Sequence, residues 1–589
     1  MQLDTKMLKK WMIYSTSALW VCFFQSPLMA QNISPGALEP EREVPMLPDI
    51  VDDNIVYVPP VAARPVDADS GPVINVQKFV VTYDEPELIA SEQINNINNL
   101  VNDYLLGSDK NFNLTELDDL TFLVTENLRE SGLMLAKAIL PAQEIESGAV
   151  AIHVFVGKFG DINSDANLLY SDSVIQYPFK NVIGDAVNLE FVESKLLRLS
   201  DMPGFTATAV FKPGNEVGET ALTVKAVNED PVSYFIQADN HGVESTGDAR
   251  LLLGVKVNNI TGHIDQLSVD TVKTFSPGDL RNARVTYQIT HPNLVHTFGL
   301  GFSKTSYDVE DVAVLALGIE GDTEIGEMFI NSQWIRQRNV NLATRLGLAV
   351  KRSNVDFTSF NVEQGVDRLT VLEASVVADS VDTRFRGVHR GSLTFSHGFN
   401  DVLGSMDGQG NGESLGIVNG EQALPGQFNK VSASYSRLQS VVRNNSLLFH
   451  FNGQYSDDSL SSLERMSLGG PYTVRAYPVA EYVRDTAVFT SLSWVINGGV
   501  FSDGNAYGEY SWSDILSLSV FADYGWGKLK DANGGPTSSI EIAGWGVETE
   551  LTFPNIGGFA RFSAAKPFDG SEAANGENTQ YWLSVGLNL

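Results

Sequence analysis

The chain has 589 residues, more than one ordinary soluble domain, and its formal net charge of −32 argues against binding to nucleic acid. Only 19% of the residues are charged, whereas 10% are aromatic and 51 are glycine, a mixture that favours many strands joined by glycine-containing turns. The single cysteine, Cys22, lies in a segment that is expected to be removed, so no disulfide is predicted.

Residues 1–30 have the pattern of a secretory signal peptide. Three lysines precede an apolar stretch over residues 11–24, and cleavage is expected after Ala30. A membrane-anchor helix is disfavoured because the apolar stretch is short and is interrupted by polar residues at 15–17.

Residues 31–73 are predicted to be a proline-rich linker. Eight prolines in this stretch exclude a long helix and favour extended chain.

Two compact α+β units of order βααββ are predicted next, over residues 74–157 and 158–230. In the first, apolar residues such as Ile97, Val101 and Leu105 recur at helical spacing. The elements expected in the first unit are a strand containing Val76, Phe79 and Val81, helices over 89–106 and 114–133, and strands over 135–140 and 150–156. Those expected in the second include a helix over 189–199 and strands over 205–211 and 220–227. One larger α+β domain is the alternative.

Residues 231–589 contain no run of about twenty apolar residues, so no transmembrane helix is expected. Apolar and small or polar residues alternate instead, as in Tyr581, Leu583 and Val585 against Trp582 and Ser584. Strands that span a bilayer must close into a barrel, since no backbone group can stay unpaired there. At about 20–22 residues per strand and turn, the segment predicts an antiparallel barrel of about sixteen strands.

Two short stretches of the barrel segment carry the clearest functional signal. The loop 468–481 holds one arginine, Arg475, and the strand 519–527 holds one carboxylate, Asp523. Alternation places Val520 and Tyr524 on the lipid face and Asp523 on the other face, where a carboxylate must be wet or paired. Arg475 and Asp523 are therefore candidate partners, either as a solvated ion pair or as a contact packed inside the barrel.

These stretches resemble the VRGY loop and the FxDxG strand motif of two-partner secretion transporters. That family is the haemolysin-activator and filamentous-haemagglutinin transporter group, within the barrel superfamily that carries POTRA domains. The resemblance implies that the loop folds back into the barrel lumen and that its arginine contacts the strand aspartate. The residues of this implied lumen-loop lock are Val474, Arg475, Ala476, Tyr477, Phe521, Asp523 and Gly525. Ala476 replaces the family glycine and is expected to be strained if that position needs a positive φ.

The resemblance implies an outer-membrane β-barrel of about sixteen strands, preceded by two periplasmic POTRA domains. Its implied function is to capture an unfolded exoprotein, of adhesin, haemolysin or haem-binding type, and to pass it to the cell surface. The other expected partners are outer-membrane lipid, periplasmic chaperones and the barrel assembly machinery. The alternatives are an assembly insertase of the same superfamily and a passive porin. Many family members carry a plug helix before the POTRA domains, and the only candidate here, 36–44, is interrupted by Pro40.

No catalytic, cofactor or metal site is expected. Residues 412–416 match G-x-S-x-G, but they lie in a polar run that predicts a loop instead of the strand and helix that a nucleophile elbow needs. Asp407 begins a partial calcium-loop pattern whose twelfth position is Val418 instead of glutamate. The eight histidines form no ligand cluster in the sequence.

Overall fold

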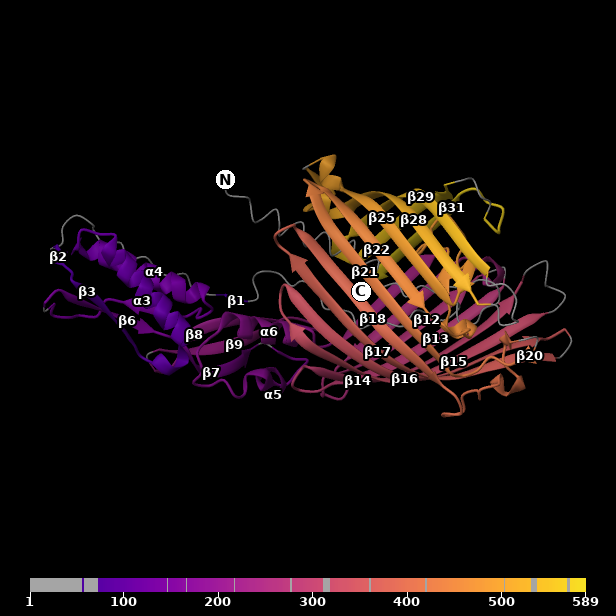
Figure 1. Cartoon of the computed structure of the whole chain (residues 1–589), viewed down its shortest axis with the longest axis horizontal. Helices are drawn as coiled ribbons and strands as arrows, with labels where there is room; N and C mark the ends of the chain where they lie inside the picture. The colour runs from indigo at the N-terminus through magenta and orange to yellow at the C-terminus, as the bar shows by residue number, and fades with distance from the viewer. Residues whose placement is uncertain are drawn as a thin grey trace. The chain divides into compact units, whose positions relative to one another are not determined.

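The computed structural model describes residues 56–57 and 73–589, apart from 146, 166, 217, 276–277, 311–317, 360–361, 419–420, 503, 531–537 and 569–572. The predicted signal peptide, the plug-helix candidate and most of the predicted linker lie outside the described residues. The chain divides into two compact units (Figure 1). One contains Val51–Asp230 and Pro292–Leu294, and the other contains Pro231–His291 and Val295–Leu589.

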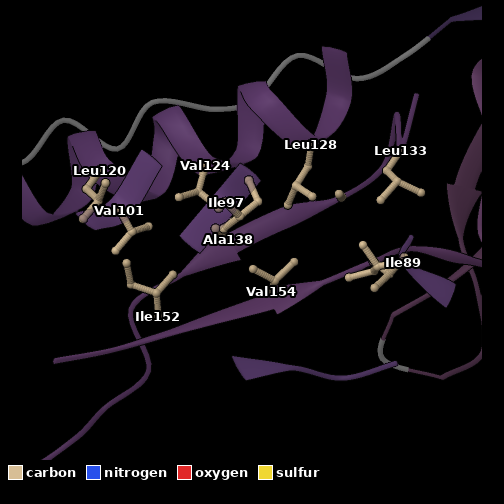
Figure 2. Packing of buried hydrophobic residues seen from close by; sticks show 12 residues of the cluster. Ile89, Ile97, Val101, Leu120, Val124, Leu128, Leu133, Ala138, Ile152 and Val154 are labelled. Carbon is tan, nitrogen blue, oxygen red and sulfur yellow. The ribbon is translucent and has the colours of Figure 1, made fainter. Parts of the chain in front are cut away.

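The unit that contains Val51–Asp230 is an α+β unit with two halves. Its first half packs two helices on a three-stranded sheet of order β3-β6-β5. Figure 2 shows Ile97, Val101, Leu120, Val124 and Leu128 of the helices facing Ala138, Ile152 and Val154 of the sheet. The elements are β2 (Ile74–Asn75), β3 (Lys78–Tyr83), η1 (Pro86–Leu88), α3 (Ser91–Leu106), β4 (Asn111–Phe112), α4 (Leu114–Glu130), β5 (Lys137–Ile139) and β6 (Ala149–Phe155).

Side-chain capping sets the start of α4, and a glycine sets its end. Asn113 accepts a hydrogen bond from the backbone N–H of Glu116, and the Glu116 carboxylate accepts one from the backbone N–H of Asn113, so α4 begins with a capping box. The helix ends three residues earlier than the predicted 133, because Gly132 adopts a φ of 101° that no helix continues.

The second half of this unit has its own sheet, of order β1-β8-β9-β7. Its first helix is a five-residue segment, and its outer strand β1 pairs in parallel with β8. The elements are β1 (Val56–Tyr57), β7 (Lys158–Asp165), α5 (Asp172–Gln176), η2 (Tyr177–Phe179), α6 (Leu189–Ser200), β8 (Phe205–Pro213) and β9 (Glu219–Glu229). Across the described part of the chain, no helix has both the length and the apolar character needed to cross a membrane.

The second unit is a closed barrel of sixteen strands, which confirms the predicted architecture. Each strand pairs antiparallel with its neighbours, and β31 closes on β10 through five residue pairs. The wall strands are β10 (Val232–Asp239), β11 (Arg250–Asn258), β12 (Asp265–Thr274), β13 (Asp279–Thr290), β14 (His296–Val309), β15 (Ile319–Arg336), β16 (Val340–Phe357), β17 (Val362–Asp382), β18 (Gly387–Phe399), β21 (Phe428–Val442), β22 (Asn445–Tyr455), β25 (Thr486–Asn497), β28 (Leu516–Leu529), β29 (Ser538–Phe553), β30 (Gly558–Pro567) and β31 (Gln580–Asn588).

The wall has an apolar outer face and a packed inner face. On β28, Val520 is 50% exposed whereas Asp523 is 2% exposed, and on β31 Tyr581 is 57% exposed whereas Trp582 is 7% exposed. The alternation predicted for both strands is therefore confirmed. The outward residues present a hydrocarbon surface, which suits contact with lipid.

Short elements lie in the connections between wall strands. They are η3 (Glu244–Thr246), η5 (Gly410–Gly412), β19 (Ile417–Val418), β20 (Glu421–Gln422), η6 (Ser462–Glu464), β23 (Met466–Leu468), β24 (Tyr482–Arg484), η7 (Gly498–Val500), β26 (Asn505–Tyr507), β27 (Tyr510–Ser511), α7 (Trp512–Ile515) and η8 (Pro554–Ile556).

Candidate functional site

Residues 456–485, here called the lumen loop, connect β22 to β25 and contact the wall on widely separated strands. Val479, Ala480 and Val483 pack in one buried cluster with side chains of β12 to β16 and with Trp582 of β31. Val474 and Tyr477 pack in another cluster with side chains of β25, β28, β29 and β30. A loop that touches inward-facing residues this far apart around the barrel lies inside the lumen, as the resemblance implied.

The tip of the lumen loop is a tight turn that glycine makes possible. Gly469 and Gly470 adopt φ values of 107° and 98°, a region that other residues rarely occupy. The hydroxyl of Thr473 donates to the carbonyl of Gly469 across 2.8 Å, and the N–H of Gly470 donates to the carbonyl of Tyr477 across 2.9 Å. These bonds fix the backbone on both sides of Arg475.

Arg475 and Asp523 form a two-pronged contact between the loop and β28. Arg475 Nε donates to Asp523 Oδ2 across 2.9 Å, and Nη2 donates to Oδ1 across 2.8 Å. The backbone N–H of Arg475 also donates to Oδ2 across 3.1 Å. The exposed fraction of the side chain is 11% for Arg475 and 0% for Asp523. The structure therefore has the packed contact and not the solvated ion pair.

The guanidinium of Arg475 has further partners on the wall. Its Nη2 donates to Ser491 Oγ of β25 across 3.0 Å, and its Nη1 approaches Glu548 Oε2 of β29 at 3.4 Å. Its central carbon lies 3.2 Å from the ring centroid of Phe521, within cation–π range. The backbone carbonyl of Arg475 accepts a hydrogen bond from Trp582 Nε1 of β31 across 2.8 Å. Four wall strands thus share one arginine.

Glycines in the wall leave room for the loop. A Cβ on Gly525 would come within 2.8 Å of Val474, and a Cβ on Gly544 of β29 would overlap the methyl group of Ala476. Tyr477 is buried beside them, with 4% of its surface exposed. Ala476 does not have a positive φ, so the conditional expectation of strain at this position does not apply.

Sequence reasoning missed Ser491, Gly544, Glu548 and Trp582. All four lie on wall strands, where the alternation that predicts an inward side chain does not say which loop residue it meets. The signal that was present is the Gly544–Gly546 pair, since glycine in a strand often marks the close approach of another backbone.

The two rejected motifs have structural roles. Ser414 of the G-x-S-x-G match is fully buried in a loop, and its hydroxyl donates to Asp367 Oδ1 of β17 across 2.8 Å. Asp407 accepts hydrogen bonds from the backbone N–H groups of Gln409 and Asn411, which makes a turn stabilised by its own side chain. In the described ranges, no group of three or more His, Cys, Asp or Glu side chains is placed to hold a metal ion.

The comparison with known families decides what this barrel is. The model of the family described as "Haemolysin secretion/activation protein ShlB/FhaC/HecB" matches residues 218–551. The chain belongs to this family. The matched segment contains the lumen loop and every residue named above on β25, β28 and β29.

Curated relatives extend the similarity over most of the chain. The heme/hemopexin transporter protein HuxB of Haemophilus influenzae (strain 86-028NP) is 26% identical over 485 residues, which cover 81% of this chain and 81% of the relative. The outer membrane transporter CdiB of Escherichia coli O6:K15:H31 (strain 536 / UPEC) is 24% identical and covers 77% of this chain and 74% of the relative. The barrel of this haemolysin secretion/activation family member is thus an outer-membrane barrel.

Solved structures share the fold. CdiB from Escherichia coli aligns with a TM-score of 0.65 at 19% identity, covering 90% of this chain and 93% of that one. BamA from Haemophilus ducreyi, solved without POTRA domains 1–3, aligns with a TM-score of 0.52 at 15% identity, covering 87% of this chain and 100% of that one. A sixteen-stranded barrel preceded by POTRA domains is therefore the architecture of this chain.

Proposed function

We propose that this chain secretes a partner exoprotein across the outer membrane by the two-partner route. The observation that carries the proposal is the membership of the haemolysin secretion/activation family, together with a closed barrel whose lumen holds a loop bound to the wall. A passive pore would not account for the match to the haemolysin secretion/activation family. The periplasm offers no ATP, so folding of the client at the cell surface would supply the drive.

The proposed division of the chain follows the sequence prediction. Residues 1–30 are proposed to be a signal peptide, 31–73 a periplasmic linker that contributes the short strand β1 to the sheet of the second POTRA domain, 74–157 and 158–230 the two POTRA domains, and 231–589 the barrel. The sheet of the first POTRA domain has β3 and β5 as its edge strands. The edge of β5 is used in part, because the N–H of Ala138 donates to Thr125 Oγ1 of α4 across 2.9 Å, so β3 is the edge proposed to take an added strand. An unfolded client can add to such an edge as an extra strand, so these domains are the proposed capture site.

The client is proposed to be a large secreted protein of the adhesin, haemolysin or haem-binding kind. Support comes from the names of the relatives, which include heme/hemopexin transporters and the hemolysin transporter protein HpmB of Proteus mirabilis. Outer-membrane lipid, periplasmic chaperones and the barrel assembly machinery complete the proposed partners. The chain is proposed to have no enzymatic activity, since the family members are transporters.

The lumen-loop lock is proposed to hold the lumen loop in the position that export requires. Arg475 and Asp523 supply the charged contact, Phe521 stacks on the guanidinium, and Gly525 leaves room for Val474. Ala476 and Tyr477 pack the loop against the wall beside them.

The test is a reconstituted secretion assay. The chain and a candidate exoprotein of the haemolysin or haem-binding kind are expressed in a Gram-negative host that lacks both, and full-length exoprotein is measured in the medium and on the cell surface. Export that requires this chain is expected. An exoprotein that stays in the periplasm while the barrel is correctly inserted would contradict the proposal. Defects in the insertion of other outer-membrane proteins would favour the insertase alternative.

A further inference from the structure

The lumen loop is bound to the wall at a second place, through Glu464 at the end of η6. Its Oε1 accepts a hydrogen bond from Lys351 of β16, and its Oε2 accepts one from Lys430 of β21 across 2.7 Å. The exposed fraction of the side chain is 1% for Glu464, 6% for Lys351 and 12% for Lys430. Charges removed from water to this degree depend on one another for stabilisation.

The backbone of the loop is held at the same place. The carbonyl of Glu464 accepts hydrogen bonds from Lys430 Nζ across 3.1 Å and from Gln454 Nε2 across 2.9 Å. Gln454 Nε2 also donates to the carbonyl of Asp485 across 3.1 Å, so one amide joins residues near the two ends of the loop. Asp485 in turn accepts from the N–H of Leu460 and from Arg465 Nε, each across 2.9 Å.

These contacts lie on a different part of the wall from the lumen-loop lock. Counted from β10, Lys351 is on the seventh strand and Lys430 on the tenth, whereas Asp523 is on the thirteenth. The chain between Glu464 and Arg475 therefore runs from one set of strands to the other. The loop also packs on the wall through Val479, Ala480 and Val483, and the hydroxyl of Ser461 donates to Asp367 Oδ2 of β17. Glu464 therefore supplies the second charged contact of the loop with the wall, beside the contact of Arg475 with Asp523.

We propose that Glu464, seated between Lys351 and Lys430, is a second anchor that positions the lumen loop independently of Arg475 and Asp523. Export then requires both anchors, which makes Glu464 a positioning residue for secretion. The requirement for Glu464 in export rests on the proposed function, whereas the attachment of the loop by Glu464 does not. Attachment and export are therefore tested by different measurements.

The experiment compares Glu464→Gln with a matched control, Glu413→Gln. Glu413 also pairs a loop with a wall strand, through Arg368 of β17 at 3.2 Å, but its side chain is 60% exposed. Attachment is measured on the purified full-length chain, with Cys22→Ser where the signal peptide is retained, as the rate at which a cysteine placed at Ser462 reacts with a water-soluble maleimide. Planar-bilayer conductance gives a second reading, and export is measured in cells.

The anchor predicts that Glu464→Gln raises the labelling rate and the frequency of large conductance openings at least threefold, and lowers export at least threefold. Glu413→Gln is expected to leave all three unchanged. Because Glu464→Gln can impair assembly, a second variant, Glu464→Lys with Lys430→Glu, keeps one carboxylate and two ammonium groups at the site and is expected to recover export and slow labelling.

Three outcomes overturn the proposal in distinguishable ways. Wild-type labelling and conductance in Glu464→Gln would show that the residue does not hold the loop. Faster labelling with wild-type export would show that the anchor holds the loop but is not needed for secretion. Failure of the exchanged pair to slow labelling would show that the charges do not act as a pair. A wild-type chain that exports nothing refutes the proposed function and leaves the labelling test intact.

Discussion

The contact between Arg475 and Asp523 is buried, and the burial determines how much free energy the removal of one partner should cost. An exposed ion pair is worth at most about 1 kcal/mol, whereas removal of one partner from a buried pair costs about 3–5 kcal/mol, because the other charge is left without its partner. With Asp523 fully buried and bound by three hydrogen bonds from Arg475, the larger figure applies.

Arg475→Ala and Asp523→Ala are each expected to reduce secretion strongly while the protein stays in the outer membrane. The barrel should survive because its wall is held by strand pairing and not by the loop. The double variant should be no worse than the worse single variant, since both residues act through one contact. Secretion and pore conductance in the four-member cycle provide the measurement. Wild-type export from both single variants would refute the lock.

Gly544 should be sensitive to a single added methyl group. Gly544→Ala would place a Cβ against the methyl of Ala476 and 2.9 Å from the carbonyl of Lys566, so the loop must shift and export should fall. Adding Ala476→Gly removes one of the two clashes and should restore part of the export. Gly326→Ala on β15 is the control, because its Cβ would meet nothing within 4 Å. Equal export from the Gly544 and Gly326 variants would refute this account of the wall glycines.

At the scale of elements, the joint between the two α+β halves carries an ion pair. Glu85 follows β3, and its Oε1 lies 2.7 Å from Nζ of Lys158, the first residue of β7. The hydrogen bond from Lys158 holds the pKa of Glu85 below its ordinary value, and the same bond raises the pKa of Lys158. The stabilisation is therefore present above the unfolded pKa of glutamate and is lost as the pH falls through the folded pKa of Glu85.

Lys158→Met is expected to raise the pKa of Glu85 towards its ordinary value. Carboxyl NMR titration of a soluble fragment covering residues 73–230 provides the measurement. Lys137→Met, at an exposed lysine of β5, is the control and should leave Glu85 unchanged. An unaltered Glu85 titration in Lys158→Met would mean that the pair does not persist in solution.

Helices and strands could be predicted from the sequence where the same environment, such as lipid on one face, acts on many successive residues. The barrel strands follow from alternation, because one face meets lipid and the other the lumen, as Tyr581 and Trp582 show. Asp523 was found because it is the lone charge in an apolar strand, and its pairing with Arg475 was implied by the resemblance of the loop and the strand to the family motifs. Glu464 was not found, since it lies in an aperiodic loop and its partner Lys351 is 113 residues away. Loop contacts of this kind depend on the closed barrel and not on local pattern.

At the scale of the whole molecule, the barrel should not need the POTRA domains in order to exist. Its sixteen strands pair with one another in a closed cycle, so deletion of residues 74–230 leaves every wall hydrogen bond in place. The truncated chain is expected to insert in the outer membrane and to show heat-modifiable migration on mild detergent gels, but to export no client. The full-length chain is the control. Persistent export would show that the POTRA domains are not the capture site.

The closure between β10 and β31 has a mechanical consequence. Outward pressure stretches every strand-to-strand joint around the barrel equally. The joint with the fewest hydrogen-bonded residue pairs therefore carries the greatest force on each pair. The ladder of this joint has five residue pairs, whereas the ladders of the others in the described wall have between eight and eighteen. Tyr234 and Leu589 extend it by exchanging two backbone hydrogen bonds, and the N–H of Asn240 donates to the carbonyl of Leu583, so it is still the shortest joint. It is also where the barrel's first and last strands meet, so no connecting loop bridges it. Under such tension β31 would separate from β10 first, and the sixteen strands would remain joined as one open sheet.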